Sequence, residues 1–233
     1  MYKKLMIAAA CCASFAAQGA TVSGPVPYVK ASDSPVAGPF VYSHLETFED
    51  NQLNTTGVTA SAGAVLGPAA TALVDSVDAD DGSVDGSGST GHSYYSNGAS
   101  AITFSFSAAA LGSLPTVVGL AFTDVGVLTI AGIGCCKSDA SFEAFDELGA
   151  SLGVVTIGGF GDGAVDGGTA EDRFVAVRHA GGISSIRVGF ANSVDWEVDH
   201  LFYARDTAGV AEPATLALAG LGLLAAGARR RRR

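Results

Sequence analysis

The chain has 233 residues, of which 48% are hydrophobic and 15% charged, and its net charge at pH 7 is −10. This length suits one all-β domain or two small ones and is sufficient for a substantial core. Seven of the thirteen basic residues lie in the two tails, so the segment 21–210 carries six Lys and Arg against twenty-two Asp and Glu, a net charge of −16. Phosphates would repel so acidic a domain, which argues against nucleic-acid binding and favours divalent cations.

Residues 1–20 have the layout of a secretory signal peptide. Lys3 and Lys4 precede an apolar run from Leu5 to Ala17, and Ala17-Gln18-Gly19 supplies small residues for cleavage. We therefore expect an N-terminal signal helix that Sec-type export machinery recognises.

The middle of the chain reads as a linker followed by strands. Residues 21–40 hold four prolines and predict a Pro-rich linker, whereas residues 41–206 alternate apolar and polar side chains between Gly-rich breaks. The candidate strands are 41–48, 101–107, 116–123, 127–133, 141–146, 152–157, 173–178, 183–190 and 197–204. About nine short strands predict an all-β fold, a single jelly-roll-like β-sandwich flanked by the signal helix and a C-terminal hydrophobic helix.

An aspartate-rich loop follows the first strands. It contains Asp75, Asp78, Asp80, Asp81 and Asp85 within eleven positions, and glycines at 82 and 86 permit tight turns. Calcium takes six to eight oxygen ligands, which such loops supply from carboxylates and backbone carbonyls. The loop is therefore a candidate structural calcium site, and the alternative is a solvated acidic loop.

A second candidate calcium site joins the two ends of the domain. Glu49 follows the first strand, and Asp199 lies in the last one, two residues after Glu197 and on the same face. Many carbohydrate-binding jelly rolls hold a structural calcium between their first and last strands. If these strands pair, Glu49 and Asp199 could share an ion; otherwise they form an exposed polar face.

Trp196, the single tryptophan, lies between two carboxylates. An exposed indole beside acidic groups can stack on a sugar ring, so Trp196 is a candidate carbohydrate-binding residue. The alternative is that Trp196 packs in the core.

No catalytic motif stands out, and we expect a protein that is not an enzyme. The histidines at 44, 92, 179 and 200 lack metal-ligand spacing, and a nucleophile-elbow motif is missing. Glu171-Asp172 before Arg173 is interpreted as local charge compensation. Cys135 and Cys136 are adjacent, which leaves a strained vicinal disulfide, an intermolecular bridge or free thiols open.

Residues 207–233 form a three-part tail. Glu212-Pro213-Ala214-Thr215 precedes an apolar run from Leu216 to Ala228. A helix over that run would be about 20 Å long, shorter than the roughly 30 Å hydrocarbon core of a bilayer. The tail ends in a cationic cluster that we expect to stop transfer and stay cytoplasmic: Arg229, Arg230, Arg231, Arg232 and Arg233.

This tail resembles the PEP-CTERM sorting signal, with alanine at 211 where the family usually has proline. The segments LPTVVGLAFTDVG and WEVDHLFYA resemble uncharacterised β-sandwich domains of other PEP-CTERM proteins. The resemblance implies transient inner-membrane insertion and processing near Glu212-Pro213 by an exosortase, followed by delivery to the cell surface or beyond. The function expected is a non-enzymatic surface or matrix protein associated with extracellular polysaccharide, and the alternatives are a secreted glycan-active enzyme or a matrix component without ligand.

Overall fold

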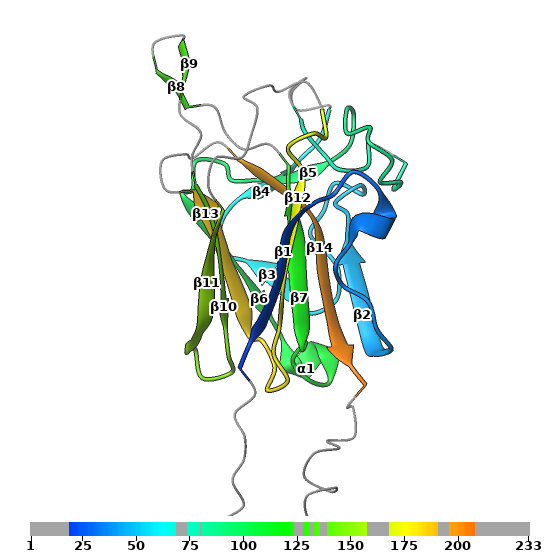
Figure 1. Ribbon diagram of the computed structural model, residues 1–233, viewed down its shortest axis with the longest axis vertical. Coiled ribbons are helices and arrows are strands. Elements are labelled where there is room, and N and C mark those ends of the chain that lie inside the picture. Colours follow the sequence, from blue (N-terminus) through cyan, green and yellow to red (C-terminus); the bar gives the residue numbers. More distant parts are fainter. Residues whose placement is uncertain are drawn as a thin grey trace, which may run out of the picture.

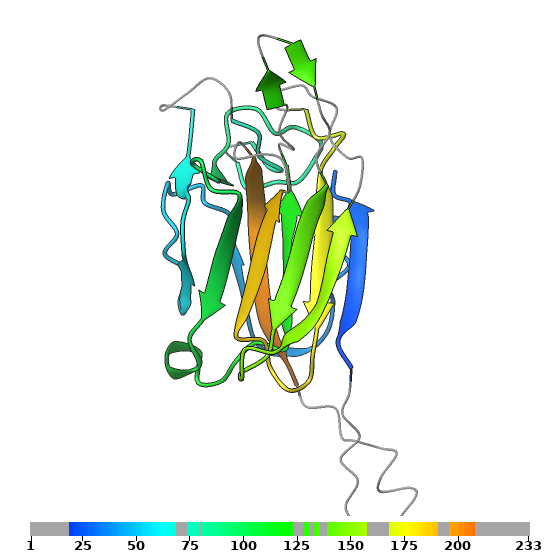
Figure 2. The same ribbon diagram turned by 90° about the vertical axis from the view of Figure 1, so that its left-hand side faces the viewer.

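A computed structural model describes residues 19–68, 74–79, 81–123, 128–130, 133–135, 139–157, 168–190 and 196–207. These residues form two antiparallel β-sheets packed face to face, with a small hairpin at one end (Figures 1 and 2). The strands are β1 (Thr21–Pro27), β2 (Phe40–Glu46), β3 (Val58–Ala60), β4 (Ala64–Leu66), β5 (Ser93–Tyr95), β6 (Ala101–Phe106), β7 (Val117–Phe122), β8 (Leu128–Ile130), β9 (Ile133–Cys135), β10 (Ala140–Phe145), β11 (Ser151–Ile157), β12 (Arg173–Arg178), β13 (Ser185–Phe190) and β14 (Glu197–Asp206). A 3₁₀ turn, η1 (Ala31–Asp33), and one turn of helix, α1 (Ala108–Leu111), complete the elements.

The strand order confirms the all-β sandwich and has jelly-roll topology. Sheet A has the order β1-β12-β7-β14-β5-β4 with β2 also on β14, and sheet B has the order β11-β10-β13-β6-β3. If the eight main strands (β2, β6, β7, β10, β11, β12, β13, β14) are numbered one to eight, sheet A reads 1-8-3-6 and sheet B reads 2-7-4-5. Strands 1 and 8, 2 and 7, 3 and 6, and 4 and 5 are thus paired, as in a long hairpin rolled into two sheets.

Alternating residues build the core between the sheets. Ile102, Phe104 and Phe106 of β6 are buried, while Thr103 and Ser105 between them are not, as the period of two predicts. Aromatic rings from both sheets meet in this core; Phe122 of sheet A and Phe190 of sheet B stack edge to face at 5.7 Å.

The other face of sheet A is also covered. The chain leaves β1 at one edge and crosses over the sheet to reach β2 on the far side of β14 (Figure 1). This crossing segment (28–36) and the aspartate-rich loop (74–79 and 81–92) together form what we call the outer layer. A second apolar cluster lies beneath it, formed by Tyr28, Val77, Val84, Ala121, Phe174 and Ala176.

The Pro-rich segment 21–40 is not a linker throughout, which corrects the sequence interpretation. Its first seven residues form β1, which pairs with β12 from Thr21 to Pro27. β1 is an edge strand, where prolines are tolerated because one side of the strand needs no backbone donors. The predicted strand 127–133 is likewise divided, into the hairpin β8–β9.

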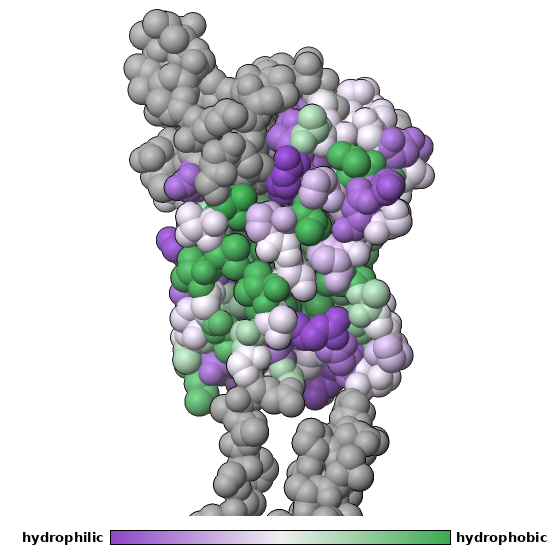
Figure 3. Space-filling model, viewed as in Figure 1, coloured by the Kyte–Doolittle hydropathy of each residue, from purple (hydrophilic) through white to green (hydrophobic). Residues whose placement is uncertain are grey.

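Several sequence predictions lie outside the described residues, among them the signal peptide up to residue 18 and the tail from residue 208. Among the described helices, none has the length and apolarity needed to cross a membrane. On the surface, apolar side chains gather over β1, β10 and β11 (Figure 3), where Val22 and Val154 are exposed. Polar side chains are more frequent over the outer layer.

Candidate metal centre

Six carboxylates are buried between the outer face of sheet A and the segments that cover it. They come from three stretches far apart in the chain: Asp75, Asp78, Glu171, Asp172, Glu197 and Asp199. In the described part of the chain no Lys or Arg side chain is buried, and His200 is the basic group within this acidic cluster. Buried charges need partners. Six carboxylates in one layer therefore require either protons or a cation.

Two of these carboxylates, both on β14, accept hydrogen bonds from the backbone of the aspartate-rich loop. The backbone N–H of Asp75 donates to Oε2 of Glu197 at 3.1 Å, and that of Val77 donates to Oδ2 of Asp199 at 3.0 Å. The Ser93 hydroxyl also donates to Glu197, at 2.6 Å. The spacing of two on each side confirms that Glu197 and Asp199 project from one face of the strand.

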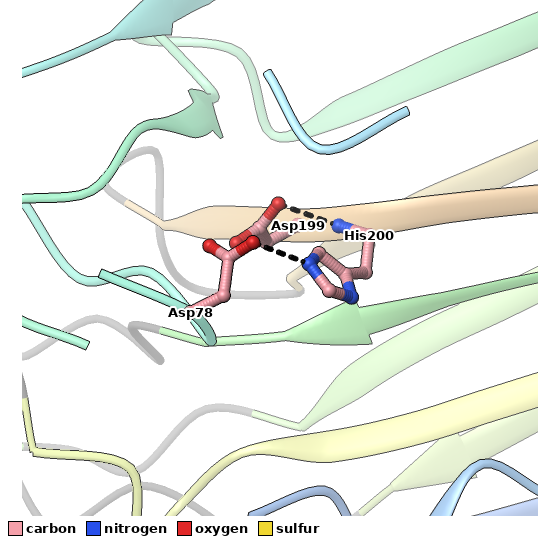
Figure 4. Close-up of side chains that lie close together, drawn as sticks. All are labelled: Asp78, Asp199 and His200. Carbon is pink, nitrogen blue, oxygen red and sulfur yellow. Dashed lines mark hydrogen bonds and ion pairs between the residues drawn. The ribbon is translucent and has the colours of Figure 1, made fainter. Parts of the chain in front are cut away.

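A bulge in β14 places His200 beside the same loop. The pairing of β14 with β7 shifts register between Asp199 and Phe202, and His200 adopts a left-handed φ of 49°. Its Nε2 lies 2.8 Å from Oδ2 of Asp78, and its backbone N–H donates to Oδ1 of Asp199 at 2.6 Å (Figure 4). Nδ1 lies 3.0 Å from the Tyr28 hydroxyl.

Ligand atoms of Asp78, Asp199 and His200 all lie within 4.8 Å of one another. Both ring nitrogens of His200 already have partners, because Nε2 bonds to Asp78 and Nδ1 bonds to the Tyr28 hydroxyl. These three residues are therefore part of the acidic cluster, and by themselves they do not make a complete metal site.

The Asp172 carboxylate accepts no hydrogen bond within the part of the chain that the structure describes. It directly precedes β12, and strand alternation places it on the face of sheet A that carries Phe174. Its side chain is 0% exposed, and among the described residues neither carboxylate oxygen has a hydrogen-bond partner. Burial, reinforced by nearby Glu171, Asp199 and Asp75, raises the pKa of Asp172 to about 9.

Neighbouring groups respond to the same concentration of negative charge. Burial and the Asp78 carboxylate raise the pKa of Asp199 to about 7, although His200 opposes the shift. Burial lowers the pKa of His200, but the carboxylates of Asp199 and Asp78 outweigh it and raise that pKa overall. Burial, followed by Asp199 and Asp78, raises the pKa of Tyr28 as well.

Not every buried carboxylate belongs to this cluster. Glu46, at the end of β2, accepts hydrogen bonds from the backbone N–H groups of Phe48, Asn54 and Thr55 at 3.0 to 3.1 Å and from the Thr55 hydroxyl at 2.7 Å. Four donors satisfy this charge, so Glu46 fixes the turn after β2 and needs no cation. Asp172 differs from Glu46 because no described residue donates a hydrogen bond to its carboxylate.

The described aspartates of the aspartate-rich loop do not point toward one common position, which corrects the first calcium prediction. Asp78 points inward, but Asp81 and Asp85 are exposed. Their Oδ1 atoms accept from the N–H groups of Ser83 and Ser87, at 2.8 and 3.1 Å, and so cap local turns. Asp80 lies outside the described residues.

The strand pairing on which the second calcium prediction depends is present: β2 pairs with β14 from Glu46 opposite Leu201 to Phe40 opposite Asp206. Glu49, however, accepts from the backbone N–H of His92 at 2.7 Å and lies 3.1 Å from its Nδ1. Asp199 belongs to the cluster, whereas Glu49 lies at its margin beside His92.

Trp196 is not a sugar platform. Its side chain is 0% exposed, its ring packs against Phe190 with centroids 5.4 Å apart, and its Nε1–H donates to the carbonyl of Ala99 at 2.9 Å. A face covered by protein cannot stack on a pyranose. Trp196 instead closes the core at the start of β14.

The sequence reading missed Glu171, Asp172 and His200 as members of a site. Arg173 lowers the pKa of Asp172, as the expected charge compensation requires, but the hydrogen bonds of its Nη1 go to the carbonyls of Ala170 and Asp172. His200 carried one signal, its position directly after Asp199 in WEVDHLFYA. The side chain of Cys135 and all of Cys136 lie outside what the structure describes.

Comparison with known proteins identifies the tail. Residues 210–233 match the PEP-CTERM protein-sorting motif. The chain carries a PEP-CTERM sorting signal. The motif implies an exported protein that is targeted to exosortase and passes through a membrane-anchored intermediate. No curated protein and no solved structure matches the chain.

Proposed function

We propose that this PEP-CTERM protein is a non-enzymatic surface or matrix component, associated with extracellular polysaccharide, whose β-sandwich binds calcium through the buried acidic cluster. The observation that supports calcium is Asp172, a fully buried carboxylate with neither oxygen hydrogen-bonded among the described residues. Asp78, Asp199 and the other cluster carboxylates supply further oxygen atoms nearby. A hard cation with many oxygen ligands would satisfy this chemistry.

The burial of the cluster supports a structural ion rather than a catalytic one. The six carboxylates are at most 5% exposed, so a polysaccharide chain could not reach an ion held among them. For the same reason the carboxylates do not favour the alternative of a glycan-active enzyme. Association with polysaccharide rests on the sorting tail alone, because Trp196 is unavailable.

Calcium binding can be tested by isothermal titration of the full chain in detergent. We expect Asp172→Asn to weaken calcium binding by at least tenfold, or about 1.4 kcal/mol, because a charged ligand is removed. Asn resembles the protonated acid in shape, so the variant should fold. Asp81→Asn, the same change at an exposed position of the aspartate-rich loop, should bind like the wild type.

The result that contradicts the proposal is an absence of calcium heat from the wild type. If both variants weakened calcium binding equally, the calcium site would instead lie at the exposed part of the aspartate-rich loop. Preference for zinc or manganese over calcium would instead assign the Asp78–Asp199–His200 trio as the centre, since imidazole suits those metals.

Processing of the tail can be tested in a host that contains an exosortase. We expect the wild-type protein to appear in a shortened form, and the double variant Glu212→Ala, Pro213→Ala to stay at full length on an immunoblot. Glu147→Ala, at an exposed acid in the β10–β11 turn, is the matched control and should be processed normally. Shortening of the double variant would place the recognition elsewhere.

A further inference from the structure

The outer layer is attached to sheet A through a small apolar cluster. Tyr28, Val77 and Val84 are its buried members from the outer layer, and the ring of Tyr28 lies 5.1 Å from that of Phe174 between centroids. The main core between the sheets includes the buried aromatic residues Phe104, Phe122, Phe142, Phe190 and Trp196. The outer layer is thus the weakly packed part of the domain.

Most of the specific ties between the outer layer and β14 pass through the acidic cluster. Asp75 and Val77 donate backbone N–H groups to Glu197 and Asp199, while Asp78 and Tyr28 bond to the two nitrogens of His200. The groups that fasten the layer are therefore the groups that a cation would hold.

Without a cation these ties are opposed by repulsion. Asp78 belongs to the outer layer, and Asp199 and Asp172 belong to sheet A, so opening the layer separates like charges and hydrates them. Closing the layer at neutral pH requires either protons on buried carboxylates or a positive ion between them. The described members of the main core are apolar side chains, so we expect its packing not to depend on the ion.

We infer that calcium is a latch: it closes the outer layer on sheet A, and its removal opens that layer as a unit while the two-sheet core stays folded. This inference rests on the calcium binding proposed above. Extracellular calcium modules have Kd values of about 10⁻⁴ to 10⁻³ M, a range that cytosolic calcium does not reach. The latch would accordingly stay open before export and close outside the cell.

Hydrogen exchange read by mass spectrometry tests the latch on the full chain in detergent. In about 1 mM calcium, peptides covering 28–36 and 74–92 should exchange at least tenfold more slowly than in EGTA. Peptides covering β10 and β13 should exchange alike in both conditions. Slowing spread evenly over both sheets, or no slowing in the outer layer, would overturn the inference.

Isothermal titration on the same samples separates the two proposals. Absence of binding heat removes the calcium site itself. Binding heat without local slowing leaves the site in place and removes the latch.

A pair of valine variants tests the coupling from the other side. Val84→Ala weakens the second apolar cluster, whereas Val58→Ala trims the main core at a similarly buried position. An ion that binds only the closed layer loses apparent affinity as the closed fraction falls. We expect Val84→Ala to speed exchange in 74–92 and weaken calcium binding several-fold, while Val58→Ala does neither. Unchanged affinity and exchange in Val84→Ala would contradict the latch.

Discussion

Replacing Trp196 with alanine is expected to lower the free energy of unfolding by about 3–5 kcal/mol, the usual cost of emptying a buried aromatic site. The side chain is 0% exposed and packs on Phe190. The substitution also leaves the Ala99 carbonyl without its indole donor, which is 2.9 Å away in the wild type. Urea unfolding in saturating calcium measures the change.

Leu148→Ala provides the control for this prediction, because Leu148 is 91% exposed in the β10–β11 turn. Its stability should stay within about 0.5 kcal/mol of the wild type. A loss below about 1 kcal/mol in Trp196→Ala would show that the indole is not part of the core, and would reopen a surface role for Trp196.

The strands of the sandwich could be predicted wherever the core enforces alternation. Ile102, Phe104 and Phe106 lie on the buried face of β6 because each strand of a sandwich has one face toward the other sheet. Four other strands escaped prediction for local reasons. Prolines at 25 and 27 concealed β1, and β3, β4 and β5 contain three residues each, too few to show a period.

The acidic cluster could be predicted only in fragments. The spacing of Glu197 and Asp199 placed both on one face, and the aspartate-rich loop was recognised as a source of carboxylates. Which members meet is decided by pairing over long separations; Asp78 and His200, for example, are 122 positions apart. The role of Asp172 could not be predicted, because an acid next to Arg173 is normally interpreted as one half of an ion pair. Only the structure shows that the guanidinium donates its hydrogen bonds to backbone carbonyls.

A second large effect is expected in the pH dependence of the calcium-free protein. The pKa of Asp172 rises from an ordinary value of 3.8 to about 9 in the folded state, so the folded protein binds a proton that the unfolded chain has released. Its contribution to stability is complete below about pH 4 and is lost as pH rises toward 9. Asp199, with a pKa of about 7, acts in the same direction between about pH 4 and 7.

The groups that face Asp172 determine the size of this effect. Burial raises the pKa of Asp172 most, Glu171, Asp199 and Asp75 raise it further, and Arg173 lowers it. In EGTA, we expect the free energy of unfolding to fall by about 1 kcal/mol per pH unit between pH 6 and 9, measured by urea unfolding at each pH. Asp172→Asn should flatten this slope, because an amide has no proton to lose.

Calcium should remove this loss of stability at high pH. An ion displaces the protons of its ligands, so calcium affinity increases with pH over the range in which the calcium-free protein weakens. In saturating calcium the stability of the wild type should therefore change little from pH 6 to 9. A calcium-free protein equally stable at both pH values would mean that these carboxylates are neither protonated nor repelling one another. The electrostatic argument for a cation among them would then fail, whatever the geometry of the cluster.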